Sequence, residues 1–305
     1  MDNVIVKWEN GPKLCGCGSK PVYFRRYEGN YYCKNCLIYH VEKRFRKTAA
    51  DLIEKGDRIT VGLSGGKDSS VLLALMHKHF SNVAEIVAVT INEGIANYRD
   101  QGIVQAEALA KRLGIEHKVF SFQDTFDVKI DELKTENYCT FCGVFRRQLL
   151  NKAALELGAD KMAIGHNLDD EVQSIMMNVL RGDVEGFRRL GAHGQEGLVR
   201  RIKPLQDVPE KEVKLYALLK EIPFHDGECP HSFNNVRRDA QKMINDLEEK
   251  YPGTKMQILS FYRKMKEPPK ENKLIPCQCG SPSSSGKCKA CELLEKIQKS
   301  NDVQQ

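Results

Sequence analysis

The chain has 305 residues, of which 41% are hydrophobic, so it is long enough for one large domain with small appendages. It contains no run of about 20 uninterrupted apolar residues and no apolar segment typical of a secretory signal near its first residues, so we expect a cytosolic (cytoplasmic) protein with no membrane partner. The net charge of +6 suits a polyanionic partner such as a nucleic acid but does not prove one.

Cysteine usage indicates metal chemistry. Eleven cysteines, an odd number, in a chain that we expect to be cytosolic predict metal ligands or catalysts rather than disulfides. They fall into three groups, and none is left over: Cys15, Cys17, Cys33 and Cys36; Cys139, Cys142 and Cys229; Cys277, Cys279, Cys288 and Cys291.

Residues 1–40 form the first predicted module. Two close cysteine pairs, with fifteen residues between Cys17 and Cys33, are typical of a zinc ribbon with four thiolates around one Zn²⁺. The first pair has one intervening residue instead of the usual two to four. Aromatic residues lie between the pairs beside Arg25 and Arg26, where they suit a small core, which we favour, or stacking on bases.

A helical pattern at 37–55 leads to a phosphate-binding loop. A β-branched run at 59–61 precedes a Ser-Gly-Gly turn, and a leucine-rich helix follows, which is the geometry that exposes helical N–H groups to an anion. This is not a Walker A loop, because Val61 stands where the first glycine belongs and Asp68 follows the lysine. Glycines let the backbone approach a phosphate, hydroxyls and an ammonium add donors, and Asp68 suits Mg²⁺. The predicted nucleotide-binding residues are Ser64, Gly65, Gly66, Lys67, Asp68, Ser69 and Ser70.

The next segments alternate between strands and helices. Strands are expected at 86–91, 116–122 and 161–164, with a helix at 99–113 after the first of them. This order predicts an α/β fold with a doubly wound parallel sheet, whose ligand sites lie beyond the carboxyl ends of the strands. Three polar segments fall there: 64–66, 92–94 and 165–167.

The central cysteines lie on a predicted helix and a loop. Cys139 and Cys142 are three residues apart near the start of a helix that runs from about 137 to 157, so they share a face. Cys229 comes from a loop at 222–231. Such thiols can share one metal centre or exchange sulfur, and we prefer both readings to a pair of buried hydrophobic side chains.

Acidic residues follow the strand at 161–164. Gly165, His166 and Asp169 are predicted to contact the nucleotide, and Asp169 and Asp170 begin a helix. These acids suit either the helix dipole or a contact with Mg²⁺ or substrate.

The remaining elements complete the expected domain. We expect a flexible glycine-rich loop over the site at 181–197, a short edge strand at 202–205, a helix at 210–220 and closing helices at 233–251 and 255–266. Short basic runs, each as typical of solvated surface as of phosphate contact, occur at 43–47, 146–147, 188–189, 200–203 and 237–238. The expected domains are a zinc ribbon at 1–40, a catalytic domain at 41–265, a linker at 266–276, and a second zinc ribbon with its tail at 277–305.

Together these motifs carry a resemblance over nearly the whole chain. The run Ser64–Ser69 resembles the loop of the N-type ATP pyrophosphatases, a Rossmann-like fold. With the three central cysteines, the Gly165–Asp170 segment and a zinc module at each end, the chain is similar to the tRNA 2-thiouridine synthetases of the TtcA/TtuA/NcsA type, in their archaeal or cytosolic eukaryotic form.

The resemblance implies an ATP-dependent tRNA sulfurtransferase that adenylates O2 of a uridine. It implies a [4Fe–4S] cluster on Cys139, Cys142 and Cys229, whose fourth iron is free to hold hydrosulfide, and catalytic roles for Lys67, Arg146 and Asp170. Arg146 suits charge stabilisation, because an arginine stays protonated. Implied cofactors are ATP, Mg²⁺ and two Zn²⁺, and implied partners are tRNA, a second copy of the chain as a homodimer, and inorganic sulfide or a ubiquitin-like sulfur carrier.

Several alternatives stay open from the residues. The modified base is expected to be the wobble uridine, with the T-loop uridine as the rival. The same adenylation is compatible with a persulfide on Cys139 or Cys142 that Cys229 resolves through a disulfide, without a cluster. A non-catalytic zinc protein that binds nucleic acid is disfavoured by the intact phosphate loop.

Overall fold

A computed structural model describes residues 13–133, 138–188, 190, 198–232 and 236–265, with a few more between 275 and 287. The chain divides into two compact units between Tyr262 and Arg263. In the second unit, β8 (Ile275–Pro276) pairs antiparallel with β9 (Pro282–Ser283). The predicted ligands of the second zinc ribbon lie outside the described residues: Cys277, Cys279, Cys288 and Cys291.

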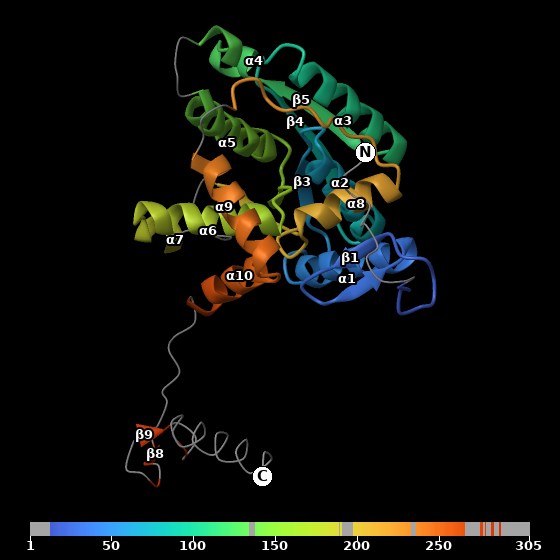
Figure 1. The fold of residues 1–305 in the computed structure, drawn as a ribbon. Coiled ribbons are helices and arrows are strands. Elements are labelled where there is room, and N and C mark those ends of the chain that lie inside the picture. Colours follow the sequence, from blue (N-terminus) through green and yellow to red (C-terminus); the bar gives the residue numbers. More distant parts are fainter. Residues whose placement is uncertain are drawn as a thin grey trace. The chain divides into compact units, whose positions relative to one another are not determined.

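A five-stranded parallel sheet organises the first unit (Figure 1). Its spatial order is β5-β4-β3-β6-β7, so the chain winds outward from β3 in one direction and then returns to build the other side. The order therefore reverses between β3 and β6, which is where doubly wound sheets bind their ligands. The predicted fold class is confirmed. The strands are β3 (Arg58–Gly62), β4 (Glu85–Asn92), β5 (Glu116–Ser121), β6 (Lys161–Ala163) and β7 (Arg200–Ile202).

Helices cover both faces of the sheet. One face, which carries Ile59 and Val61, packs against α1 (Lys34–Ala50), α2 (Lys67–Phe80), α3 (Arg99–Leu113) and α8 (Glu210–Leu219). The opposite face carries Val89 and Ile91 and packs against α4 (Phe122–Phe126) and α5 (Tyr138–Glu156). Because strand side chains alternate between faces, this division gives the sheet a core on both sides.

A third hydrophobic cluster joins the closing helices. α6 (Leu168–Arg181) packs against α9 (Val236–Lys250) and α10 (Thr254–Met265) through residues that include Val172, Ile244 and Leu259. α6 begins with a capping box, in which Asn167 and Asp170 each bind the other's backbone N–H. This cap fixes the direction of the chain as it leaves β6 beside the phosphate loop.

The structure corrects parts of the predicted secondary structure. Residues 181–197 do not form one loop, because α6 continues to Arg181, Gly182 ends it in the left-handed conformation, and Val184–Arg188 forms α7. Residue 189 and residues 191–197 lie outside the described part. The edge strand is Arg200–Ile202 instead of 202–205, since Pro204 lacks the N–H that a ladder needs. The short α4 and the turn of 3₁₀ helix η1 (Ile130–Glu132) were not predicted.

The cysteine-containing N-terminal module docks on the same unit. β1 (Tyr23–Arg25) and β2 (Asn30–Tyr32) form an antiparallel pair that leads into α1. Arg25 is fully buried and its guanidinium donates two hydrogen bonds of 2.7–2.8 Å to the buried carboxylate of Glu212 in α8. Phe24 stacks on Tyr31 with ring centroids 4.4 Å apart, as expected for a small core.

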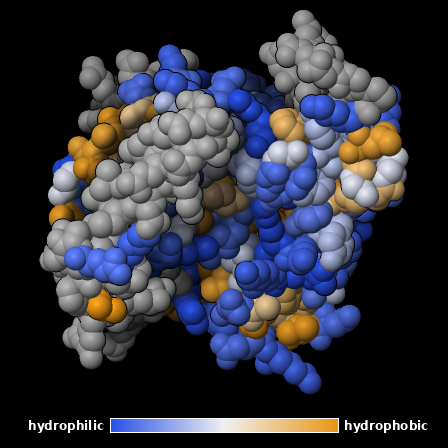
Figure 2. Space-filling view, turned by 60° about the horizontal axis from the view of Figure 1, so that its bottom comes forward, coloured by the Kyte–Doolittle hydropathy of each residue, from blue (hydrophilic) through white to orange (hydrophobic). Residues whose placement is uncertain are grey.

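The face drawn in Figure 2 is mainly hydrophilic where its residues are described. Figure 2 shows hydrophobic side chains in separate patches among hydrophilic ones on one face. Within the described residues, no helix is both long and apolar enough to cross a membrane.

Candidate active site

The phosphate loop closes tightly because two glycines meet. Gly65 has a φ of +78°, and a Cβ there would lie 1.9 Å from the carbonyl oxygen of Gly102 in α3. Gly66 is the N-cap of α2, and no side chain caps this helix start, so its first N–H groups remain available to an anion. Ser69 Oγ accepts from the Ser64 N–H at 3.1 Å and donates to the Gly66 carbonyl oxygen at 3.0 Å. These contacts fix the loop in a conformation that leaves the first N–H groups of α2 free to bind a phosphate.

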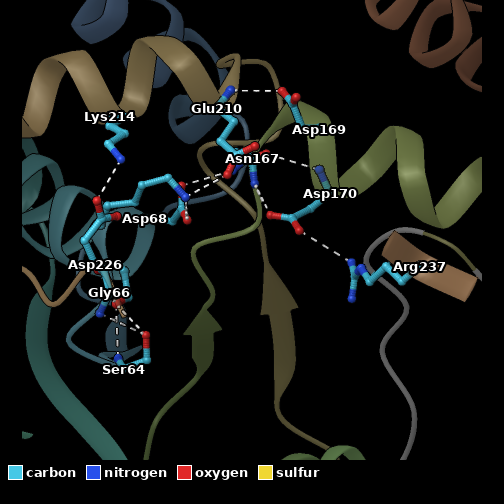
Figure 3. A network of polar contacts seen from close by, with 12 residues as sticks. Ser64, Gly66, Asp68, Asn167, Asp169, Asp170, Glu210, Lys214, Asp226 and Arg237 are labelled. Atoms are coloured by element: carbon cyan, nitrogen blue, oxygen red, sulfur yellow. Dashed lines mark hydrogen bonds and ion pairs between the residues drawn. The ribbon is translucent and has the colours of Figure 1, made fainter. Parts of the chain in front are cut away.

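Charged and amide groups connect this loop to the start of α6 (Figure 3). Lys67 Nζ lies 3.0 Å from the Asp68 carboxylate and 2.7 Å from that of Glu210, and Asn167 donates to Asp68 at 3.0 Å. Burial raises the pKa of Asp68, and the Lys67 charge opposes that shift. Burial alone would lower the pKa of Lys67, but the charges of Asp68 and Glu210 raise it, so the lysine stays charged. The Asp68 carboxylate thus lies beside the loop in a position that suits a cation.

The two predicted acids of α6 have different surroundings. Asp170 lines the cavity described below, and its carboxylate lies 3.5 Å from Arg237 in α9. Asp169 is 5% exposed, accepts from the Glu210 N–H at 2.9 Å and pairs with Lys255. Its oxygens therefore join α6 to α8 and α10, and its predicted contact with the nucleotide stays a prediction. Ser70 is fully buried in α2.

One cavity of about 650 Å³ connects the phosphate loop to the central cysteines. Its walls include Ser64, Asp68 and Ser69 from the loop, Gly165 and His166 after β6, and the thiols of Cys139, Cys142 and Cys229. Gly165 is required for this approach, because a Cβ there would lie 2.9 Å from the Ser69 nitrogen. Five of the predicted nucleotide residues therefore share this space with the three cysteines, whereas Gly66 and Lys67 line a neighbouring pocket of about 290 Å³.

Helix α5 supplies the sulfur end of the cavity through one face. The residues that line the cavity recur at intervals of three and four, as expected for a single helix face: Cys139, Cys142, Gly143, Arg146, Arg147 and Leu150. Cys139 Sγ lies 3.7 Å from the carbonyl oxygen of His231, close after Cys229 in the chain. The His231 ring pairs with Asp131 at 2.7 Å and stacks on Tyr138, which fixes this loop against α5.

The environment of the thiols suits sulfur chemistry. Burial raises the pKa values of Cys142 and Cys229, while the charge of Arg146 opposes both shifts. Arg146 Nη2 lies 2.9 Å from Cys142 Sγ. Three thiols in one cavity, with no fourth cysteine lining it among the described residues, are the donor set that a [4Fe–4S] cluster with one open iron requires.

A buried carboxylate holds two arginines between the nucleotide and sulfur ends. Glu93 follows β4 and is 1% exposed. Its Oε1 accepts from Arg99 Nη2 at 3.1 Å and lies 2.9 Å from Arg146 Nε. Arg99 also donates to the carbonyl oxygen of Ser64 at 2.9 Å. Glu93 and Cys142 raise the pKa of Arg146 against the lowering effect of burial, so this side chain is a fixed positive charge beside the sulfur.

The N-terminal cysteines form a cluster whose arrangement fits a metal ion. The sulfur atoms of Cys15, Cys17, Cys33 and Cys36 all lie within 4.8 Å of one another. Tetrahedral Zn²⁺ with bonds of about 2.3 Å separates its sulfur ligands by about 3.8 Å, so the four thiols fit that ion. Hydrogen bonds from Ser19 lower the pKa of Cys17 to about 6, and hydrogen bonds with the other cysteines raise the pKa of Cys36 to about 12. Four thiols this close can all ionise together only when a cation balances their charge.

Comparison with known proteins decides the family. The PP-loop domain family matches residues 37–242. The chain is 38% identical over 316 residues to tRNA 2-thiolation protein NcsA of Haloferax volcanii, covering 92% of this chain and 98% of that protein. The chain belongs to the PP-loop family of tRNA 2-thiolation proteins.

Other members of the tRNA 2-thiolation family give the same result. Cytoplasmic tRNA 2-thiolation protein 1 of Xenopus laevis is 35% identical, covering 88% of this chain and 82% of that protein. The solved structure of U34-tRNA thiolase NcsA from Methanococcus maripaludis with its [4Fe-4S] cluster matches with a TM-score of 0.78 and 36% identity, covering 94% of this chain and 97% of that one. The predicted resemblance is confirmed, and the predicted enzyme class, a tRNA sulfurtransferase, is that of the family.

Several site residues were not predicted from the sequence. Glu93 was noted only as part of a strand end, and Arg99, Gly102 and Glu210 were not singled out. A charged residue directly after an apolar strand, and a glycine inside a helix where it costs about 1 kcal/mol, are the signals that point to Glu93 and Gly102. Arg99 and Glu210 carry no such signal, because their partners come from distant segments.

Proposed function

We propose that this protein converts a tRNA uridine to 2-thiouridine, adenylating O2 with ATP and replacing that oxygen with sulfur. The observation that carries the proposal is one cavity that part of the phosphate loop (Ser64, Asp68 and Ser69) shares with Cys139, Cys142 and Cys229. A base held between them is within reach of both half-reactions, so the activated intermediate need not leave the protein.

The first half-reaction belongs to the phosphate loop. The uridine O2 attacks the α-phosphorus of ATP, and pyrophosphate leaves with the electrons of the broken P–O bond. The free N–H groups at the start of α2 bind phosphate oxygens, and Lys67 turns from Glu210 to the negative charge that develops on the leaving pyrophosphate. Asp68 holds Mg²⁺ in this proposal, since its carboxylate lies beside the loop.

The second half-reaction belongs to the sulfur end. Cys139, Cys142 and Cys229 would hold the [4Fe–4S] cluster, which supplies an iron open to an external sulfur ligand when it is bound. Sulfur, from inorganic sulfide or a ubiquitin-like carrier, replaces O2 at C2, and AMP departs with that oxygen. Arg146, held by Glu93 beside Cys142, stabilises negative charge on the incoming sulfur. Asp170 positions Arg237 at the same cavity.

The wobble uridine is the proposed target. It is supported by the structural relative, which is a U34-tRNA thiolase, and the relatives named cytoplasmic tRNA 2-thiolation proteins support a cytoplasmic location. A homodimer and a second structural Zn²⁺ at the C-terminal cysteines remain predictions.

Two matched variants test the proposal. Protein is prepared without oxygen, its iron and sulfide are measured, and its tRNA products are analysed by mass spectrometry of nucleosides. Cys142→Ala should lose both iron and 2-thiouridine. Asp68→Asn should keep the iron and lose release of AMP and pyrophosphate, because it alters only the ATP end.

The results also separate the alternatives. Wild-type protein that is fully active without iron would refute the cluster and favour a persulfide route. Iron-loaded wild-type protein that releases no AMP with tRNA present would refute the enzyme itself.

A further inference from the structure

Two arginines line the cavity, and no carboxylate among the described residues pairs with either. Arg147 lies on the cavity face of α5, next to Arg146, and Arg201 comes from the edge strand β7. Arg201 Nη2 donates to the backbone carbonyl oxygen of Arg147 at 3.2 Å, so the two residues are neighbours. Within the described part of the chain, neither forms an ion pair, whereas Arg146 pairs with Glu93 and Arg237 with Asp170.

Placing two like charges together disfavours the folded protein unless an anion joins them. The side chain of Arg201 is half-buried, and its pKa is lowered by burial and then by the charge of Arg147. A guanidinium cannot relieve this cost by losing its proton, because its intrinsic pKa exceeds about 12. Paired guanidinium groups that face one space are a favourable arrangement for a phosphate, which takes two parallel N–H bonds from each.

The position of the pair matches one nucleotide. α5 rises about 1.5 Å per residue, so Arg147 lies about 7.5 Å further along the helix axis than Cys142. That is about the distance from the C2 edge of a pyrimidine to the phosphate of its own nucleotide. A base whose C2 faces the thiols thus directs its backbone phosphate toward the pair. The phosphate loop, by contrast, already provides the helix N–H groups for ATP.

We propose that Arg147 and Arg201 bind the RNA backbone phosphate beside the uridine to be modified. The inference rests on the proposed function, since it takes tRNA as the substrate. It gives the cavity a third point of attachment: ATP at the loop, the base at the thiols, and the sugar-phosphate backbone at the arginine pair. Bound this way, the uridine is fixed by its phosphate and cannot slide past the sulfur.

The test compares charge-removed variants with a neighbouring arginine. Arg147→Gln, Arg201→Gln and the double variant are compared with Arg200→Gln, which removes an exposed arginine of the same strand that does not line the cavity. Binding of unmodified tRNA is measured by fluorescence anisotropy at several salt concentrations, and KM for ATP and iron content are measured in the same preparations. Arg147 is exposed, so Arg147→Gln remains informative if Arg201→Gln folds poorly.

The double variant should bind tRNA at least tenfold more weakly, and its log–log salt slope should fall by about 0.7 for the lost phosphate contact. KM for ATP and iron content should match those of Arg200→Gln. Unchanged tRNA affinity and an unchanged salt slope would overturn the inference. A raised KM for ATP with unchanged tRNA binding would also overturn it, because it would assign the arginine pair to the nucleotide. Wild-type protein that binds no tRNA would instead refute the proposed function.

Discussion

Replacing Glu93 by glutamine should disturb both ends of the cavity at once. The substitution keeps the size of the side chain but removes the charge that holds Arg99 and Arg146. Arg99 is 5% exposed, so it would be left as a buried cation without its carboxylate. Arg146 has 47% of its side chain exposed to the cavity, so solvent would replace much of its lost partner.

The expected cost follows from this difference in burial. Breaking a fully buried ion pair costs about 3–5 kcal/mol, and because only one of the two arginines is deeply buried we expect a loss of about 2–4 kcal/mol in the free energy of unfolding. For a unit of this size, each kcal/mol lowers the melting temperature by about 2–4 °C, which gives a decrease of roughly 5–15 °C. Glu132→Gln is the control, since its pair with Lys129 is exposed and worth about 0–1 kcal/mol.

Function should change in a way that stability alone does not explain. Well below the melting temperature, KM for ATP should rise, because Arg99 no longer holds the Ser64 carbonyl. The visible absorption or electron paramagnetic resonance spectrum of iron-loaded protein should shift, because Arg146 is no longer held against Cys142. A melting temperature within about 1 °C of the wild type, with an unchanged KM and spectrum, would show that the Glu93 charge does not organise these arginines.

Four further results are expected. Gly102→Ala should raise KM for ATP although alanine favours a helix by about 1 kcal/mol, because its Cβ would lie 2.8 Å from the Ser64 carbonyl oxygen; an unchanged KM in nucleotide titrations would contradict this. Lys67→Met should slow AMP release at least tenfold while the melting temperature stays within a few degrees, since its partners are partly exposed. Cys33→Ser should lower the zinc content by about one Zn²⁺ per chain relative to the wild type in a colorimetric assay, and it should lower the melting temperature. Burial lowers the pKa of His117, so as the pH decreases the unfolded state binds a proton before the folded state does. The melting temperature, measured from pH 8 to 5, should therefore decrease as the pH is lowered beyond about 6.5, and it should decrease less in His117→Gln.

Local sequence patterns predicted the secondary-structure elements and the chemistry of the site better than they predicted the contacts between distant residues. The helix at 99–113 matches α3 residue for residue, because its pattern ends at Gly114, which takes the left-handed conformation. The phosphate loop and the Cys139–Cys142 spacing were also legible, since each depends on residues close in sequence. The rule that parallel strands share a carboxyl edge predicted that 64–66 and 165–167 lie together, but it does not place the helix with Cys139 and Cys142 beside them.

Pairings between distant segments could not be predicted. Glu210 contacts Lys67 across 143 residues, and Arg201 contacts Arg147 across 54, so no local spacing connects them. Asp169 is a residue for which a local pattern suggested a role but its distant contacts could not be predicted. Its place beside Asp170 suggested a ligand, but successive helix positions point in different directions, and its carboxylate is directed into the packing of three helices.

The docking of Arg25 on Glu212 has a consequence for how this protein can be divided. A chain shortened to begin after the first module would lose the Arg25 partner of Glu212 and uncover this part of α8, two residues from the glutamate that restrains Lys67. Deleting the module would therefore disturb α8 beside the phosphate loop even if the module never touches RNA. A contact of this kind favours the inheritance of the N-terminal module and the catalytic domain together, instead of as exchangeable modules.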